Sequence, residues 1–240
     1  MLIQGLMIAG LALIHLLAGK LRYFNDVPRS SWLSFAGGIS VAYVFIHVFP
    51  ELEEAQKTLS SQGAISFIEH HAYLVALAGL TVFYGLERLV KQHSQPAHGE
   101  PRGTTPPRPG VFWLHIGSFT LYNGLVGYLL VYREGQSHEL LFYFLAMAFH
   151  FLVNDHGLYQ HHRGNYLHKG RWVLAAAVIV GWLLGLTVKI SEAATSTLFA
   201  FLAGGVVLNV LKEELPEERL SRFWPFAVGA VLYAVLLLVG

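Results

Sequence analysis

Apolar runs separated by short polar stretches make up most of this chain of 240 residues. An α-helix rises about 1.5 Å per residue, so about 20 apolar residues cross the hydrocarbon core of a bilayer. On this template the pattern predicts an all-α integral membrane protein with one transmembrane domain. Its eight spans are expected at about residues 2–19, 31–51, 65–87, 111–132, 138–160, 171–190, 194–214 and 222–240, and the fifth is the least apolar.

The longest polar stretch, residues 91–110, separates the third predicted span from the fourth. Its prolines and glycines break a helix, and it has few apolar side chains to bury. We expect it to be a linker. Its two histidines, His93 and His98, are too few to favour a metal site over a plain linker.

The basic residues indicate how the spans are oriented, because Lys and Arg gather on the cytoplasmic side of a membrane. If the N-terminus lies outside, only Lys57, Arg133 and Lys189 of the 16 Lys and Arg fall on the outer side. This alternation predicts that both termini lie outside and that the linker 91–110 lies inside. We expect the protein in a plasma membrane, the inner membrane of a bacterium.

The composition supports the membrane assignment and narrows the candidate chemistry. The chain is 54% hydrophobic and 13% charged, with a mean hydropathy of +0.49. An ordinary soluble domain does not reach this value. The chain has no cysteine, so any metal would be held by His, Asp, Glu, Asn or water. We expect membrane lipid around the protein and no nucleic-acid partner, and leave a homodimer open.

Two segments of the chain share one design. Residues 35–55 and 201–220 each contain Ala-Gly-Gly, an apolar run, a polar residue and then Pro-Glu, although the spacing from the second Gly to the Pro differs by one residue. Span two and span seven are predicted to run in opposite directions. The pattern therefore indicates an inverted repeat, which is typical of transporters with a site near the membrane midplane. The alternative is that the glycines only permit close helix packing and that Pro-Glu only ends a helix.

Polar pairs mark both ends of the proposed repeat. His47 and Glu51 are four residues apart near the outer end of span two, and Asn209 and Glu213 are four apart near the inner end of span seven. Residues four apart share a helical face. One pair is therefore predicted toward each mouth of a path through the membrane.

Spans four and five carry polar groups at membrane depth, where such groups are costly and usually face a bundle interior or a wet cavity. Asn123 and His150 are both expected near the midplane. His150 and Asn154 share a face and are predicted to meet span four, with Asp155 about one turn deeper. The polar residues of the two spans are His115, Ser118, Tyr122, Asn123, His150, Asn154, Asp155 and His156.

Two interpretations of this cluster remain open. Imidazole, amide and carboxylate groups can bind a divalent cation such as zinc, iron or manganese. They can equally form a hydrogen-bond network that joins two helices. His161, His162 and His168 follow in a predicted inner loop, as interfacial residues or as an exit site.

Taken together, these features resemble the ZIP (zinc/iron-regulated transporter-like) metal transporters. The resemblance rests on eight spans with both ends outside, a histidine-containing inner loop after span three, the "HVFPE" end of span two and the "AGG…LPEE" form of span seven. It implies a three-plus-two-plus-three helix arrangement. It also implies uptake of a divalent metal such as zinc into the cytoplasm, through a site between spans four and five.

The family's span-four pattern, H-N-x-x-[DE]-G, reads "YNGLVG" here. Asn123 and Gly127 match, while Tyr122 stands in the place of the histidine and Val126 in the place of the acid.

The family's span-five pattern, H-x-x-P-E-G, reads "HFLVND". His150 matches, but Asn154 stands in the place of the glutamate and Asp155 follows it. Two site carboxylates are thus missing from their usual positions. Asp155 would substitute only if span five were rotated or wound differently.

The leading hypothesis is a ZIP-like permease that takes a divalent metal, zinc first, as its substrate, with His150, Asn154, Asn123 and Asp155 lining the centre. The alternative is a ZIP-like protein that does not transport but senses metal or binds a partner. An intramembrane zinc hydrolase using His150, His156 and Asp155 lacks a compact motif, so we do not expect an enzyme. Haem binding would need facing axial histidines, which His47, His115 and His150 could supply.

Overall fold

The computed structural model describes residues 1–17, 31–61, 71–94, 109–133, 137–214 and 222–239, and all regular structure in these ranges is helical. The α-helices are α1 (Leu2–Leu17), α2 (Ser31–Tyr43), α3 (Phe49–Ser61), α4 (His71–Ser94), α5 (Pro109–Tyr132), α6 (Ser137–Asn165), α7 (Arg171–Thr187), α8 (Glu192–Asn209) and α9 (Phe223–Val239). Three five-residue π-helical segments continue them: η2 (Val44–Val48), η3 (Tyr166–Gly170) and η4 (Val210–Glu214).

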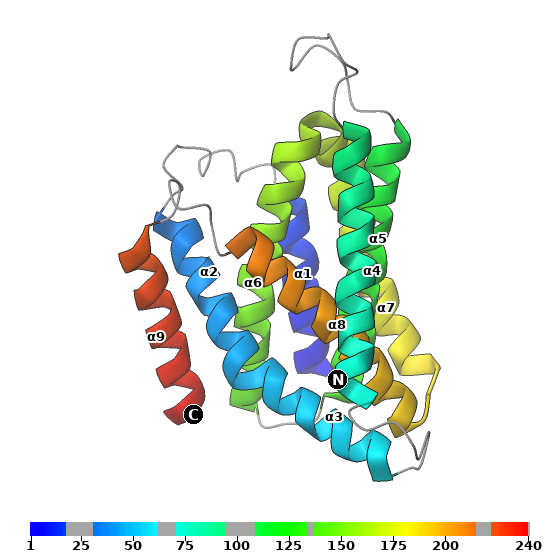
Figure 1. Cartoon of the computed structure of the whole chain (residues 1–240), viewed down its shortest axis with the longest axis vertical. Coiled ribbons are helices and arrows are strands. Elements are labelled where there is room, and N and C mark those ends of the chain that lie inside the picture. Colours follow the sequence, from blue (N-terminus) through cyan, green and yellow to red (C-terminus); the bar gives the residue numbers. More distant parts are fainter. Residues whose placement is uncertain (18–30, 62–70, 95–108, 134–136, 215–221, 240) are drawn as a thin grey trace.

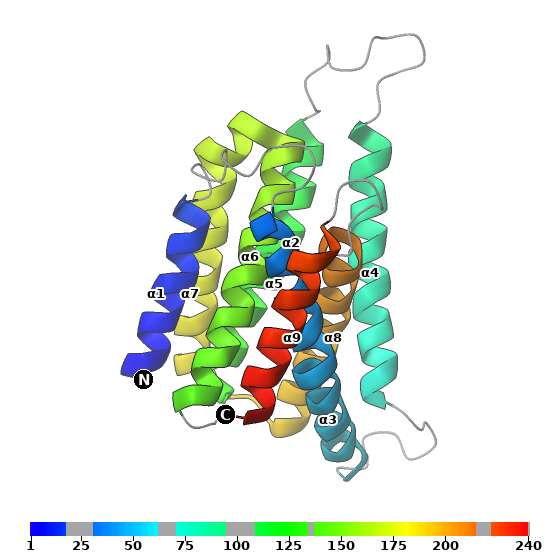
Figure 2. The same cartoon turned by 90° about the vertical axis from the view of Figure 1, so that its left-hand side faces the viewer.

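The helices form one elongated bundle, and both chain termini lie toward the same end of it (Figures 1 and 2). This arrangement requires an even number of helical passes along the bundle. Five described helices are long and apolar enough to cross a membrane: 31–61, 71–90, 110–132, 166–187 and 192–212. The helices Leu2–Leu17 and Phe223–Leu238 are apolar but shorter. The remaining helix, α6, corresponds to the predicted fifth span and is not among these apolar helices.

Several predicted boundaries differ from the observed ones. Span two was expected to end at residue 51, but the helix continues through Pro50 to Ser61. Proline removes one backbone hydrogen bond and its ring crowds the carbonyl four residues earlier. The wider turn of η2 lies directly before Pro50, where it accommodates this disruption. After Pro50, α3 has polar exposed residues and buries only Leu52, Ala55 and Leu59.

The predicted inner loop between spans five and six is also helical. α6 extends to Asn165 and continues through η3 into α7, so His161, His162 and His168 all lie on helix. The linker prediction at 91–110 is tested only at its ends, since residues 95–108 lie outside the described part of the chain. Residues 91–94 still belong to α4, and α5 begins at Pro109.

Glycines set the closest approach of the helix pairs α2/α9 and α4/α8. A Cβ atom on Gly38 would lie 2.1 Å from the Phe226 carbonyl oxygen, and one on Gly229 would lie 2.2 Å from that of Phe35. In the second pair, a Cβ on Gly204 would lie 1.9 Å from the Ala76 oxygen. Such spacings leave no room for any side chain, and they are the small-residue contacts by which membrane helices pack.

The pair α5/α7 uses the same contact, between Gly127 and the Val178 carbonyl oxygen and between Gly181 and that of Gly124. These crossings fix α5 beside α7. α1 packs against both α7 and α6, and a side-chain hydrogen bond joins α6 to α5. The polar face of α5 is thereby held between α1 and α6, where the central site lies.

Candidate functional site

The most deeply buried polar contacts join α1, α5 and α6. The Nδ1 atom of His15 lies 2.9 Å from both carboxylate oxygens of Asp155, and its Nε2 atom lies 3.0 Å from Oδ1 of Asn123. His15 is 1% exposed and Asp155 is fully buried. Three helices that are far apart in the sequence therefore meet at one imidazole ring.

The protonation of this group follows from its hydrogen-bond partners. Asn123 donates its amide N–H to the Phe119 carbonyl, so its Oδ1 is the atom that accepts from His15. Nε2 of His15 thus donates to Asn123, and a single proton lies between Nδ1 and the carboxyl group of Asp155. The buried pair of His15 and Asp155 is therefore neutral as a whole.

A second cluster lies about one helical turn away on α6. The hydroxyl of Tyr122 lies 2.8 Å from Nε2 of His150, and the amide nitrogen of Asn154 lies 3.0 Å from the same atom. All three side chains are at most 4% exposed. The Oδ1 atom of Asn154 is buried and has no hydrogen-bond donor within the described residues.

The predicted meeting of spans four and five is therefore observed for Tyr122, His150 and Asn154. Asn123 and Asp155 belong instead to the group around His15. α6 is regular α-helix through this region. Successive residues then point about 100° apart, so Asp155 faces α1 and does not replace the missing carboxylate beside His150.

His15 was not among the predicted site residues, although it lies in the first apolar span. The rule that an ionisable residue at membrane depth is a functional candidate would have found it. Among the other candidates, His156 follows Asp155 on α6 and is half-buried, while Asn209 is buried at the end of α8. The side chain of Glu213 lies outside the described part of the structure.

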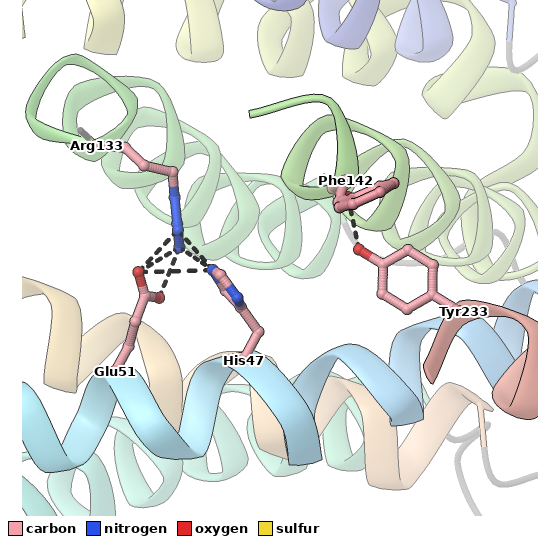
Figure 3. Close-up of polar contacts among 5 residues, drawn as sticks. All are labelled: His47, Glu51, Arg133, Phe142 and Tyr233. Atoms are coloured by element: carbon pink, nitrogen blue, oxygen red, sulfur yellow. Dashed lines mark hydrogen bonds and ion pairs between the residues drawn. The ribbon is translucent and has the colours of Figure 1, made fainter. Parts of the chain in front are cut away.

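At one end of the bundle, Arg133 joins span four to span two (Figure 3). Its guanidinium donates to Glu51 at 2.6–2.8 Å and lies 2.9 Å from Nε2 of His47. His47 and Glu51 share a face as predicted. Close by, the Tyr233 hydroxyl donates to the Phe142 carbonyl at 2.6 Å and ties α9 to α6.

A pocket of about 240 Å³ opens beside this cluster. Its wall includes Glu51 and Arg133, and its lining extends from exposed Glu54 to buried Met147. Met147 lies three residues before His150 on α6, hence on the same helical side. The pocket therefore reaches to within about one helical turn of His150 along α6.

At the opposite end, four side chains form a chain of contacts. Lys212 Nζ lies 2.7 Å from Glu87, Glu87 lies 3.2 Å from Nε2 of His115, and Nδ1 of His115 lies 2.9 Å from Nε2 of His162. Glu87 and His162 touch opposite sides of the His115 ring, so their donor atoms do not converge on one point. The group links η4, α4, α5 and α6.

We predict that Glu87→Gln lowers the free energy of unfolding by about 1–2 kcal/mol, because it weakens charge-assisted contacts to Lys212 and His115. Thermal unfolding in detergent, followed by circular dichroism, measures the change. Glu53→Gln is the control, since the Glu53–Lys57 ion pair is exposed and such pairs contribute little. Equal effects of the two substitutions would contradict a stabilising role for the Glu87 group.

No group of three His, Asp or Glu side chains in the described residues is arranged to hold a metal ion. The central clusters instead combine a carboxylate, imidazoles, amides and a phenol, with charge balanced inside the protein. The residue types in these clusters resemble those of a metal site, but their arrangement does not.

The fold and these buried polar groups define the class as an all-helical membrane protein. No protein-family model, curated protein or solved structure matches the chain. Any more specific function has to be argued from its own residues.

Proposed function

We propose that this chain is a ZIP-like transporter, built on an inverted repeat, that moves a divalent metal cation across the membrane. The repeat is supported by helix contacts. The Phe35 and Phe201 carbonyls each lie against a glycine, Gly229 and Gly79 respectively. Three residues later, Gly38 and Gly204 each lie against a carbonyl of the same partner helix.

Aligning Phe35 with Phe201 also aligns the two π segments. η2 begins at Val44 and η4 at Val210, each nine residues after its phenylalanine. In the same alignment Pro50 matches Pro216, so the one-residue difference in spacing disappears. α2 and α8 run in opposite directions through the bundle (Figure 1). A chance likeness of two Gly pairs would not place both irregular turns at equivalent positions, and this supports the three-plus-two-plus-three arrangement.

The observation that carries transport is the Asn154 Oδ1 atom, a buried acceptor without a donor beside His150. Leaving such an atom unsatisfied is costly. An oxygen beside an imidazole nitrogen is a donor set that zinc, iron or manganese accepts. The pocket that extends to Met147 gives such a cation a route toward these atoms.

Uptake by the purified protein in proteoliposomes tests this proposal, with a Zn²⁺ indicator trapped inside. We expect His150→Ala to lower the initial rate at least about tenfold, since one lost ligand contact of about 1.4 kcal/mol has this effect. Lys189→Gln, an exposed change at the end of the bundle that holds the termini, should leave the rate unchanged. Uptake that is insensitive to His150→Ala would rule out this path.

A second candidate function is a ZIP-like protein that senses metal or binds a partner without transport. It is favoured by the pairing of Asp155 with His15, which leaves the neighbourhood of His150 without a carboxylate. It predicts no flux of Zn²⁺, Fe²⁺ or Mn²⁺ by a folded protein. Asn154→Asp separates the two candidates, because a restored acid raises flux only where a transport path exists.

A further inference from the structure

The outer cluster of His47, Glu51 and Arg133 has the form of an occupied cation site. Two guanidinium nitrogens of Arg133 contact both oxygens of Glu51 at 2.6–2.8 Å and one nitrogen of His47 at 2.9 Å (Figure 3). Carboxylate and imidazole thus converge on one positive charge. The Nε2 of His47 also lies 3.7 Å from Oε1 of Glu51, so the two side chains face a common point.

The identity of Arg133 determines the state of its two partners. A guanidinium only donates hydrogen bonds and does not lose its charge in proteins. Nε2 of His47 must therefore be the acceptor nitrogen of a neutral ring, and Glu51 accepts as a carboxylate. These are the protonation states in which imidazole and carboxylate bind a metal ion.

The surroundings hold this arrangement in place. Tyr43 stacks on the His47 ring with centroids 5.1 Å apart, and Arg133 lies 4.2 Å above the Tyr143 ring. His47 lies in η2, and π segments inside α-helices are often found at functional sites. These contacts therefore hold both the His47 ring, a potential metal ligand, and the Arg133 guanidinium in place.

The three side chains of this site are also partly exposed. Glu51 and His47 are 29% and 27% exposed, while Arg133 is 14% exposed. Glu51 and Arg133 line the pocket of about 240 Å³ that extends toward Met147. A cation that enters this pocket therefore meets Glu51 at its wall.

We propose that His47 and Glu51 form an entry site for a divalent transition-metal ion, and that Arg133 is a tethered cation that occupies this site when no metal is bound. Metal binding displaces the guanidinium from Glu51 and His47, and Arg133 retains its contact with the Tyr143 ring. The inference rests on the proposed transport function for the purpose of the site, but the site itself is tested by binding alone.

Titration of the purified full-length protein with Co²⁺ in detergent tests this site through visible absorption of the bound ion. All variants carry His150→Ala, so that the central cluster does not contribute. We expect Arg133→Gln to bind Co²⁺ at least about tenfold more tightly than the parent, a change of about 1.4 kcal/mol. Adding Glu51→Gln should remove this gain.

Lys189→Gln is the charge-matched control, because it removes one exposed positive charge at the same end of the bundle and should not change Co²⁺ affinity. If Arg133→Gln does not fold, Arg133→Lys replaces it, since lysine keeps the charge but loses the forked contact. That variant must then bind Co²⁺ more tightly than the parent. The proposal is overturned if neither variant gains affinity, or if the gain survives Glu51→Gln.

Because the readout is equilibrium binding, its outcome is independent of whether metal crosses the membrane. A protein that transports no metal but gains Co²⁺ affinity in Arg133→Gln would retain the entry site and lose only the proposed transport. A protein that takes up Zn²⁺ but shows no such gain would keep the transport function and exclude this site.

Discussion

Replacing Asp155 by alanine is expected to lower the free energy of unfolding by about 3–5 kcal/mol, because it removes one partner of a buried ionisable pair and leaves His15 without it. His15 is 1% exposed, so water does not reach it to compensate. Nδ1 of His15 has then lost its buried hydrogen-bond partner, and any charge on the ring is unbalanced. Unfolding in mixed micelles with increasing SDS, followed by circular dichroism, measures the loss.

A double-mutant cycle isolates the pair from the cavity that the substitution creates. His15→Ala and Asp155→Ala together should destabilise by at least about 2 kcal/mol less than the sum of the two single changes, since neither partner is then left behind. Asp155→Asn is the isosteric variant, which keeps the shape and removes the charge. Strict additivity in the cycle would show that His15 and Asp155 do not form an ion pair.

The sequence predicted the helices well because bilayer thickness imposes a length on every apolar run. It was least accurate where a helix leaves the expected membrane region. Pro50 followed by Glu51 predicts the end of span two, but the chain continues to Ser61 as an amphipathic helix. The same applies to residues 161–170, where polar composition suggested a loop and the chain stays helical. At such places the composition indicates the hydropathy of a segment but does not predict its backbone conformation.

The candidate site was predictable only within spans four and five. Periodicity placed Tyr122, His150 and Asn154 together because residues four apart share a face. It could not show that Asp155 faces α1, since the contact with His15 joins residues 140 positions apart in sequence. The contacts of Arg133 could not be predicted for the same reason. Its partners His47 and Glu51 belong to another helix, and in the sequence it was only one of three outer basic residues.

Two of the π segments each carry a residue of a charged cluster. η2 carries His47, which contacts Arg133, and η4 carries Lys212, which contacts Glu87. Each end of the bundle thus has a charged contact that involves a π segment. π segments inside α-helices are often found at functional sites.

The glycine crossings lead to the second large expected effect. Gly79→Leu should lower the free energy of unfolding by about 3 kcal/mol, because even its Cβ atom would lie 2.1 Å from the Phe201 carbonyl oxygen. Backbone atoms cannot rotate away as a side chain can, so α4 and α8 must separate. Gly85→Leu on the same helix is the matched control, since a Cβ there meets no atom within 4 Å. Its own effect should stay within about 1 kcal/mol, because leucine is the better helix former.

The same unfolding assay in mixed micelles measures both variants, and equal losses would mean that the crossing does not determine how closely α4 and α8 pack. Gly229→Leu should have a similar effect, because its Cβ atom would press on the Phe35 carbonyl oxygen in the same way.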